Sequence, residues 1–137
     1  FNNGLINEKK IKEHSQKILS DFSVNTNNVE LKSQFLSGGN LQKLIIGREL
    51  ITSPELLICF NPTWGLDVGA INYIHETLIK INEQKKSIIL ISTDTDELLK
   101  LCDKICVIFK GKLSNIMNAE EVTSEKLGIL MGGGEIV

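Results

Sequence analysis

The chain has 137 residues, which is the size of one ordinary domain with one hydrophobic core. Hydrophobic residues make up 42% and charged residues 23%, and no apolar run reaches the roughly 18 residues that a bilayer span needs, which argues against a transmembrane protein. Fifteen basic and seventeen acidic residues give a net charge of -2 without a basic stripe, so the electrostatic pattern of a nucleic-acid binder is missing.

The N-terminal part predicts two helices. The first covers about 8–21, has apolar residues recurring on one face, and would be capped by Asn7. Small polar residues and glycines at 37–40 then break the chain. A second helical pattern follows from Leu41 and should stop before Pro54.

The middle of the chain predicts a strand, a helix and a second strand. Residues 56–60 and 87–91 are apolar runs of strand length, and helical spacing over 71–81 joins them. Residues 104–109 would form a third strand. Strands that are apolar at every position are expected in parallel sheets covered by helices on both faces, so the predicted fold class is α/β.

Three short elements complete the prediction: a helix capped by Asp94, an antiparallel strand after a turn, and a last helix. They cover about 95–101, 112–117 and 124–130. The glycines at 132–134 are expected to form a loose tail.

The cysteines indicate a reducing environment. Cys59, Cys102 and Cys106 each lie in or beside an apolar run, where a thiol behaves as a small hydrophobic side chain. We interpret them as reduced core residues.

The stretch Leu36–Gln42 has the composition of an anion site. It places the Ser37 hydroxyl and two glycines directly before a helix, where backbone N–H groups are unpaired and carry the positive end of the helix dipole. Glycine lets the backbone approach a phosphate closely. The alternative is an ordinary helix cap with a flexible entry loop.

Two further loops should lie near one sheet edge, because each follows a predicted parallel strand. Residues 61–70 follow the first strand, and residues 92–97 follow the second. Ligands of α/β folds bind at the carboxyl ends of parallel strands.

This ordered set of motifs closely resembles the nucleotide-binding domain of ABC transporters, over almost the whole chain. The signature would be 36–40, the Walker B strand 56–61, the D-loop 65–67, and the H-loop histidine position Thr93. Asn40-Leu41-Gln42-Lys43, together with 62–70, is most similar to the second ATP-binding half of bacterial importers for simple sugars or nucleosides.

Several departures from the family pattern affect the nucleotide site of this chain. Phe60 and Asn61 stand where the family has an Asp and a Glu, and neither side chain supplies an anionic metal ligand or a carboxylate base. Thr93 replaces the histidine. The chain also lacks Gly-x-x-x-x-Gly-Lys-[Ser/Thr], so we expect it to be the C-terminal part of a longer polypeptide.

The resemblance implies a division into the end of a helical subdomain, 1–36, and the C-terminal half of a P-loop ATPase core, 37–137. The signature would close over ATP held by the phosphate loop of a partner domain, and Asp67 of the D-loop would join it. The signature residues are Ser37, Gly38, Gly39, Asn40 and Gln42.

The resemblance also implies the surroundings of the intact subunit. ATP and Mg²⁺ would bind there, whereas this chain alone would bind neither and would have no catalytic residue or metal ligand. The expected partners are the N-terminal half of the same subunit, a second copy and transmembrane permease subunits. The expected location is the inner face of the plasma membrane, on the cytoplasmic side.

Two alternatives stay open at this point. The chain could be a non-catalytic docking or regulatory module that uses the signature and Asp67 loops to bind a partner ATPase. A chromosome-maintenance or repair ATPase is disfavoured, because no heptad run suggests a coiled-coil arm.

Overall fold

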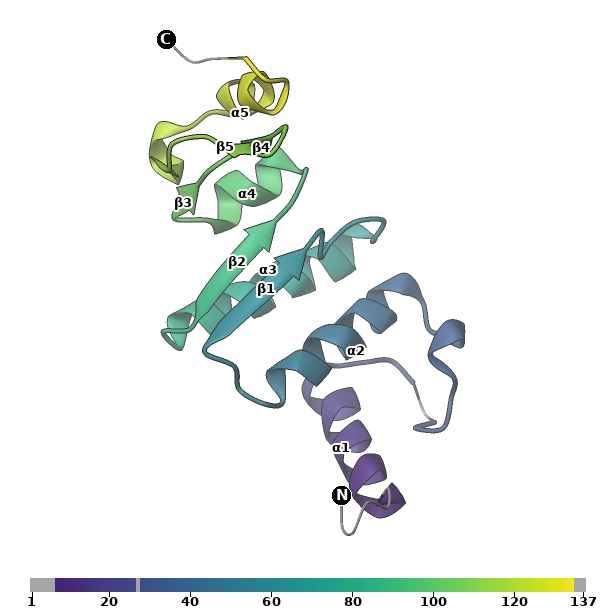
Figure 1. Ribbon diagram of the computed structural model, residues 1–137. Coiled ribbons are helices and arrows are strands. Elements are labelled where there is room, and N and C mark those ends of the chain that lie inside the picture. The colour runs from purple at the N-terminus through teal and green to yellow at the C-terminus, as the bar shows by residue number, and fades with distance from the viewer. Residues whose placement is uncertain (1–6, 27, 135–137) are drawn as a thin grey trace. The chain divides into compact units, whose positions relative to one another are not determined.

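The computed structural model describes residues 7–26 and 28–134 (Figure 1). The helices are α1 (Glu8–Asp21), α2 (Gly38–Leu50), α3 (Val68–Glu83), α4 (Thr95–Leu101) and α5 (Ser124–Met131). The strands are β1 (Leu56–Phe60), β2 (Ser87–Ile91), β3 (Lys104–Ile105), β4 (Ile108–Phe109), β5 (Lys112–Leu113) and β6 (Met117–Asn118). Short 3-10 turns are η1 (Ser33–Phe35) and η2 (Ala119–Glu121).

The chain folds into two compact units, and each is described by itself. One unit comprises Phe1–Glu55 and Thr63–Thr77, and the other comprises Leu56–Pro62 and Leu78–Val137. Helix α3 therefore begins in the first unit and ends in the second. The predicted division at 36/37 rests on the family resemblance and stays a prediction.

In the first unit, the two predicted helices are confirmed and pack on each other. The Asn7 side chain caps α1 by accepting the Lys10 N–H at 3.1 Å. Helix α2 ends at Leu50, before Pro54, but it starts at Gly38 and not at Leu41. The Ser37 cap allows this earlier start, because it fixes the backbone of both glycines in the first helical turn.

A glycine lets α1 and α2 approach closely. A Cβ atom added at Gly47 would lie 2.7 Å from side-chain atoms of both Ile18 and Phe22. Carbon atoms in ordinary contact are about 3.5–4.0 Å apart, so no larger residue fits here without rearrangement.

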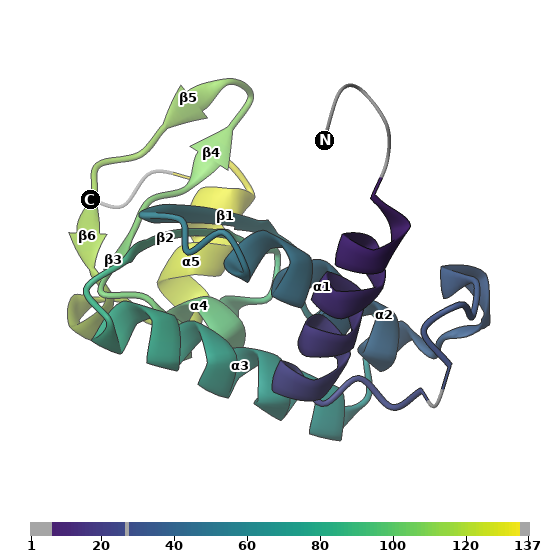
Figure 2. The same cartoon turned by 90° about the horizontal axis from the view of Figure 1, so that it is seen from below.

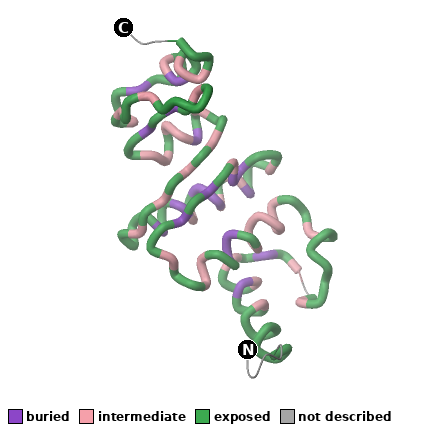
Figure 3. The backbone as a smooth tube through the Cα atoms, viewed as in Figure 1, coloured by how far each residue is buried: buried purple, intermediate pink, exposed green. Residues whose placement is uncertain are grey.

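In the second unit, β1 and β2 form the predicted parallel pair, in the register Leu57 to Ile88 and Cys59 to Leu90 (Figure 2). The predicted α/β class is confirmed, but one face of this pair is not covered within the described residues. Leu57 and Cys59 are buried, but exposed residues alternate with them along β1 (Figure 3). The exposed apolar set on β1 and β2 is Leu56, Ile58, Phe60, Ile89 and Ile91.

The predicted third strand is also wrong in its extent and pairing. The run 104–109 divides into β3 and β4, which pair antiparallel with β6 and β5, so within the described residues it adds nothing to the parallel sheet. The return strand, predicted over 112–117, is likewise split. The turn at Lys110 and Gly111 has positive φ at both positions, which suits a two-residue hairpin.

The last part of the second unit has a small core of its own. Asp94 caps α4 by accepting the N–H groups of Asp96 and Glu97, and α5 covers nearly the predicted residues. The buried residues of this core are Ile105, Val107, Val122 and Leu127.

The expectation of a loose glycine tail at 132–134 is wrong. The Gly133 and Gly134 amides donate to the carbonyls of Leu130 and Ile129, and this closes the end of α5. Gly133 has a φ of 83° and lies against the Phe109 ring, where an added Cβ would overlap the ring. A side chain there would therefore be excluded both by backbone conformation and by packing.

Candidate functional site

Ser37 stands at the exposed start of α2 with its oxygen already oriented by the protein. The Ser37 Oγ accepts the backbone N–H of Asn40 at 3.4 Å and the Asn40 Nδ2 at 3.0 Å. Because both contacts use lone pairs of the oxygen, the hydroxyl hydrogen stays available for a ligand.

Asn40 connects the start of α2 to the preceding segment. Its Oδ1 accepts the backbone N–H of Asn25 at 2.8 Å, while its Nδ2 reaches Ser37. Both ends of the carboxamide are thus engaged by the protein, and the side chain positions Ser37. The sequence predicted Asn40 as a ligand contact and gave no signal for this bridging role.

The two glycines of the signature have different surroundings. An added Cβ at Gly38 would meet only Leu66 at 3.5 Å, an ordinary contact, and Gly38 is exposed. An added Cβ at Gly39 would lie 2.9 Å from the Cβ of Ala70. Gly39 is therefore required for the packing of α2 on α3, whereas the space at Gly38 is open to a ligand.

The first turn of α2 offers unpaired amides. The N–H groups of a first helical turn have no partner within the helix, and no contact among the described residues engages those of Gly38 and Gly39. They carry the positive end of the helix dipole at an exposed position.

Asp67 lies beside this turn and caps the next helix. Its Oδ1 accepts the Ala70 N–H at 3.0 Å, and its Oδ2 would be 3.7 Å from a Cβ at Gly39. The predicted D-loop residue and the signature are thus brought together, and the carboxylate is oriented by the start of α3.

Gln42 and Lys43 complete the exposed end of α2. Gln42 is half-buried on the second turn. The Lys43 ammonium lies 4.3 Å from the centre of the Tyr73 ring and donates to the Ser23 carbonyl at 3.4 Å. This cation–π contact ties α2 to α3, and sequence reasoning missed it because nothing in the sequence pairs these two positions.

The three departures from the family pattern lie in the second unit. Asn61 has a φ of 44°, and its Oδ1 accepts the Thr93 N–H at 3.2 Å. The Asn61 N–H donates to the Ile91 carbonyl at 2.7 Å. Asn61 therefore joins the loops that follow β1 and β2 by hydrogen bonds, in a backbone conformation that asparagine tolerates.

Phe60 and Thr93 add no polar chemistry to this edge. Phe60 is 73% exposed, and Thr93 is exposed and bonded through its backbone to Asn61. Residues 60 and 61 supply no carboxylate, and no group of three His, Cys, Asp or Glu side chains suited to a metal ion occurs in the described part of the chain. These residues do not fit a magnesium site.

The cysteines follow the prediction in part. All three are free thiols, and Cys59 is buried, but Cys106 is exposed and so is not a core residue. Burial, together with the nearby Glu97 carboxylate, raises the pKa of Cys59 to about 11. Burial also raises the pKa of Cys102, with smaller contributions from the carboxylates of Asp103 and Glu97. Neither the buried Cys59 thiol nor the half-buried Cys102 thiol is a reactive nucleophile near neutral pH.

The chain resembles import ATP-binding proteins along most of its length. It is 43% identical over 133 residues to the nucleoside import ATP-binding protein NupA of Lactococcus lactis, covering 97% of this chain and 26% of the relative. It is 38% identical to the guanosine import ATP-binding protein NupO of Bacillus subtilis, with 95% and 26% covered. It is 38% identical over 124 residues to the galactose/methyl galactoside import ATP-binding protein MglA of Vibrio vulnificus, with 90% of this chain and 25% of the relative covered.

Solved structures show the same fold. The ABC transporter component cbiO1 of Clostridium perfringens is 27% identical with a TM-score of 0.65, over 93% of this chain and 51% of that one. A dimeric ATP-binding cassette, MJ0796, bound to ADP and phosphate, is 22% identical with a TM-score of 0.70, over 85% and 50%. No protein-family model matches the chain.

These matches place the chain among the ATP-binding domains of ABC transporters. In particular, it is a homologue of the C-terminal part of nucleoside and sugar import ATP-binding proteins, and it spans about a quarter of the length of the curated relatives it matches. No helix among the described residues has the length and apolar character of a membrane span.

Proposed function

We propose that this chain supplies the signature surface of an ABC importer ATPase, closing over ATP that is held by the phosphate loop of a partner domain. The observation that carries the proposal is the exposed first turn of α2, where the Gly38 and Gly39 amides are unpaired and Ser37 is held by Asn40. Amides and a hydroxyl at a helix start are suited to the terminal phosphate of a nucleotide.

The proposed mechanism assigns stabilisation and positioning to this chain. The Gly38 amide and the Ser37 hydroxyl would donate to the γ-phosphate as negative charge develops, and the fixed orientation of Ser37 means that little reorganisation is needed. Asp67, oriented by Ala70, would complete the surface that faces the partner. The phosphate loop and the residues that hold Mg²⁺ would come from elsewhere in the assembly.

The chain's own nucleotide site is proposed to be silent. Asn61 is engaged with Thr93 and Ile91, and Phe60 has no polar group, so neither side chain can hold the metal or accept a proton from water. An intact signature in a chain whose own site is silent is consistent with one competent site per pair of domains.

For the intact importer, the relatives' names support a nucleoside or simple-sugar cargo. We further propose the partners and location that the resemblance implies: the N-terminal half of the domain, a second copy, and permease subunits at the cytoplasmic face of the membrane. Within this scheme, 1–36 would end the helical subdomain and 37–137 would form the C-terminal half of the ATPase core.

The test is the steady-state ATPase rate of the reassembled importer carrying Gly38→Asp. A carboxylate at Gly38 would occupy the phosphate position with like charge, and losing one such phosphate donor costs on the order of 10²-fold in rate. Phe60→Ala is the matched control and should leave the rate nearly unchanged, because Phe60 is exposed. Loss of activity in a folded Asn61→Ala variant with retention in Gly38→Asp would reverse the assignment and make this half catalytic in its own right.

A further inference from the structure

The backbone of Asn25 holds the Asn40 side chain in one orientation. A carboxamide can be turned by half a rotation with little change of shape, so its orientation is decided by the groups that face its oxygen and its nitrogen. The Asn25 N–H lies 2.8 Å from the Asn40 Oδ1, and a backbone N–H can only donate. The turned carboxamide would place its own NH₂ group against this donor. The Asn40 oxygen therefore faces Asn25, and its Nδ2 faces Ser37.

The orientation of Asn40 determines what the Ser37 hydroxyl can do. The Asn40 Nδ2 can only donate, and it lies 3.0 Å from the Ser37 Oγ, while the Asn40 backbone N–H lies at 3.4 Å from the same oxygen. A serine hydroxyl has two lone pairs and one hydrogen. Both lone pairs are used by these contacts, so Ser37 is left with its hydrogen and can only donate to a ligand.

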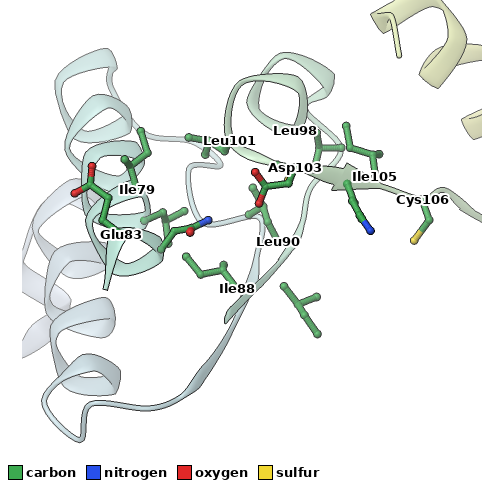
Figure 4. A pocket seen from close by; sticks show the side chains of 14 residues that line it. Ile79, Glu83, Ile88, Leu90, Leu98, Leu101, Asp103, Ile105 and Cys106 are labelled. Carbon is green, nitrogen blue, oxygen red and sulfur yellow. The ribbon is translucent and has the colours of Figure 1, made fainter. Parts of the chain in front are cut away.

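This polarity matters because Ser37 is exposed. The second unit has a cavity of about 660 Å³, lined by side chains such as Leu90, Leu98 and Ile105 (Figure 4), and Ser37 and Asn40 are not part of its lining. At an exposed position, water offers a hydroxyl both donors and acceptors. Asn40 removes one of these two states, so that the hydroxyl does not have to reorganise when an acceptor arrives.

The segment that carries Asn25 is itself anchored on α2. Val24 is 5% exposed, and its N–H donates into the end of α1 at 3.0 Å. The Ser23 carbonyl accepts the Lys43 ammonium at 3.4 Å, about one helical turn beyond Asn40. Polar contacts to α2 therefore lie on both sides of the buried Val24. The position of this segment decides whether the Asn25 N–H meets the Asn40 side chain.

We propose that Asn40 is a positioning residue that makes Ser37 an obligate hydrogen-bond donor to a phosphate oxygen, and that the Asn25 backbone sets this polarity. An ionised terminal phosphate presents only acceptors at its free oxygens, so it matches a hydroxyl that can only donate. A displacement of 23–25 from α2 would free the carboxamide to turn and would remove the fixed direction of the Ser37 hydrogen. This inference rests on the proposed function, because it takes the terminal phosphate as the ligand.

The alternative is that Asn40 only ties the segment before it to α2. The substitution Asn40→Asp separates the two roles. A carboxylate keeps an oxygen that can accept the Asn25 N–H, so the tie is retained. The second oxygen has no hydrogen to donate to Ser37, and the Ser37 hydroxyl would turn and donate to the carboxylate.

The experiment measures the steady-state ATPase rate of the reassembled importer with Asn40→Asp, Ser37→Ala and both changes together. Asn40→Asp should lower the rate at least about tenfold, since losing one phosphate donor costs on the order of 10²-fold. In the Ser37→Ala background the same change should cost less than about twofold, because the hydroxyl through which it acts is gone. Urea unfolding of Asn40→Asp should keep the midpoint of the unmodified chain, since the contact with Asn25 remains.

Two further variants control for charge and folding. Asn28→Asp makes the same substitution in the preceding segment, where the Asn28 Oδ1 accepts the Glu30 N–H at 2.8 Å and a carboxylate oxygen can accept it equally. It should leave the rate unchanged. Asn40→Leu has a similar size and no charge, and it should lower the rate at least about tenfold with the same non-additivity toward Ser37→Ala. If Asn40→Asp does not fold, Asn40→Leu decides.

Two results would overturn the inference. Rate losses that multiply in the double variant show that the new charge acts on the phosphate directly and not through Ser37. Full activity of a folded Asn40 variant shows that the Ser37 hydroxyl needs no fixed polarity. In both cases the proposed function stands if Gly38→Asp and Ser37→Ala are impaired. If those two variants are as active as the unmodified importer, the proposed function fails and this inference fails with it.

Discussion

The two signature glycines give the sharpest test of the local structure, because they are adjacent in sequence and differ in packing. In Gly39→Ala, the new methyl carbon would lie 2.9 Å from the Cβ of Ala70, about 0.6–1 Å inside the ordinary carbon contact distance. In Gly38→Ala the nearest atom is a Leu66 carbon at 3.5 Å, which needs no movement.

The expected stabilities therefore differ in sign. Replacing glycine by alanine in a compatible helical conformation stabilises a protein by about 0.4–1 kcal/mol, through the unfolded state, and Gly38→Ala should show this gain. At Gly39 the same gain is opposed by an overpacking cost of about 1–3 kcal/mol. We expect a net loss of roughly 1–2 kcal/mol for Gly39→Ala.

Urea unfolding followed by far-ultraviolet circular dichroism measures both variants against the unmodified chain. Gly39→Ala should unfold at lower urea concentration and Gly38→Ala at equal or higher concentration, with similar slopes. The reasoning is refuted if Gly39→Ala is as stable as the unmodified chain, because α2 and α3 would then not pack at this distance.

Three further predictions concern the second unit and ligand binding. Asn61→Gly removes the hydrogen bond to the Thr93 amide and should lower the free energy of unfolding by about 1 kcal/mol. Asn61→Ala should lower it by roughly 1 kcal/mol more, because alanine is strained at the positive φ of position 61, and urea unfolding measures both variants. At pH 8, iodoacetamide should modify the exposed Cys106 before Cys59, because the Cys59 thiol, with a pKa of about 11, is only about 0.1% ionised. Mass spectrometry measures the two modification rates, and equal rates would contradict the burial of Cys59. Calorimetry should detect no saturable micromolar Mg-ATP binding by this chain alone, because residues 60 and 61 lack carboxylates.

The sequence predicted elements best where local chemistry decides them. Asn7 and Asp94 cap α1 and α4 as expected, because a side-chain oxygen at that position satisfies amides within its own turn. The apolar runs of β1 and β2 were likewise sufficient to predict these two strands and their parallel pairing. Each run has strand length, and the helix that connects them makes parallel pairing possible.

Prediction was less complete at the candidate site. The signature pattern correctly placed a helix start next to Ser37, but it put both glycines before the helix and assigned one role to both. The separate role of Gly39 depends on the approach of Ala70, and the role of Asn40 depends on Asn25. Each contact joins residues more than ten positions apart, which local patterns do not encode.

The errors in the sheet have a common physical origin. An apolar run reports that a strand prefers to be buried, but it does not identify the strand that pairs with it or the surface that covers it. Residues 104–109 are apolar enough for an interior strand, yet within the described residues they form only short antiparallel ladders beside an open cavity.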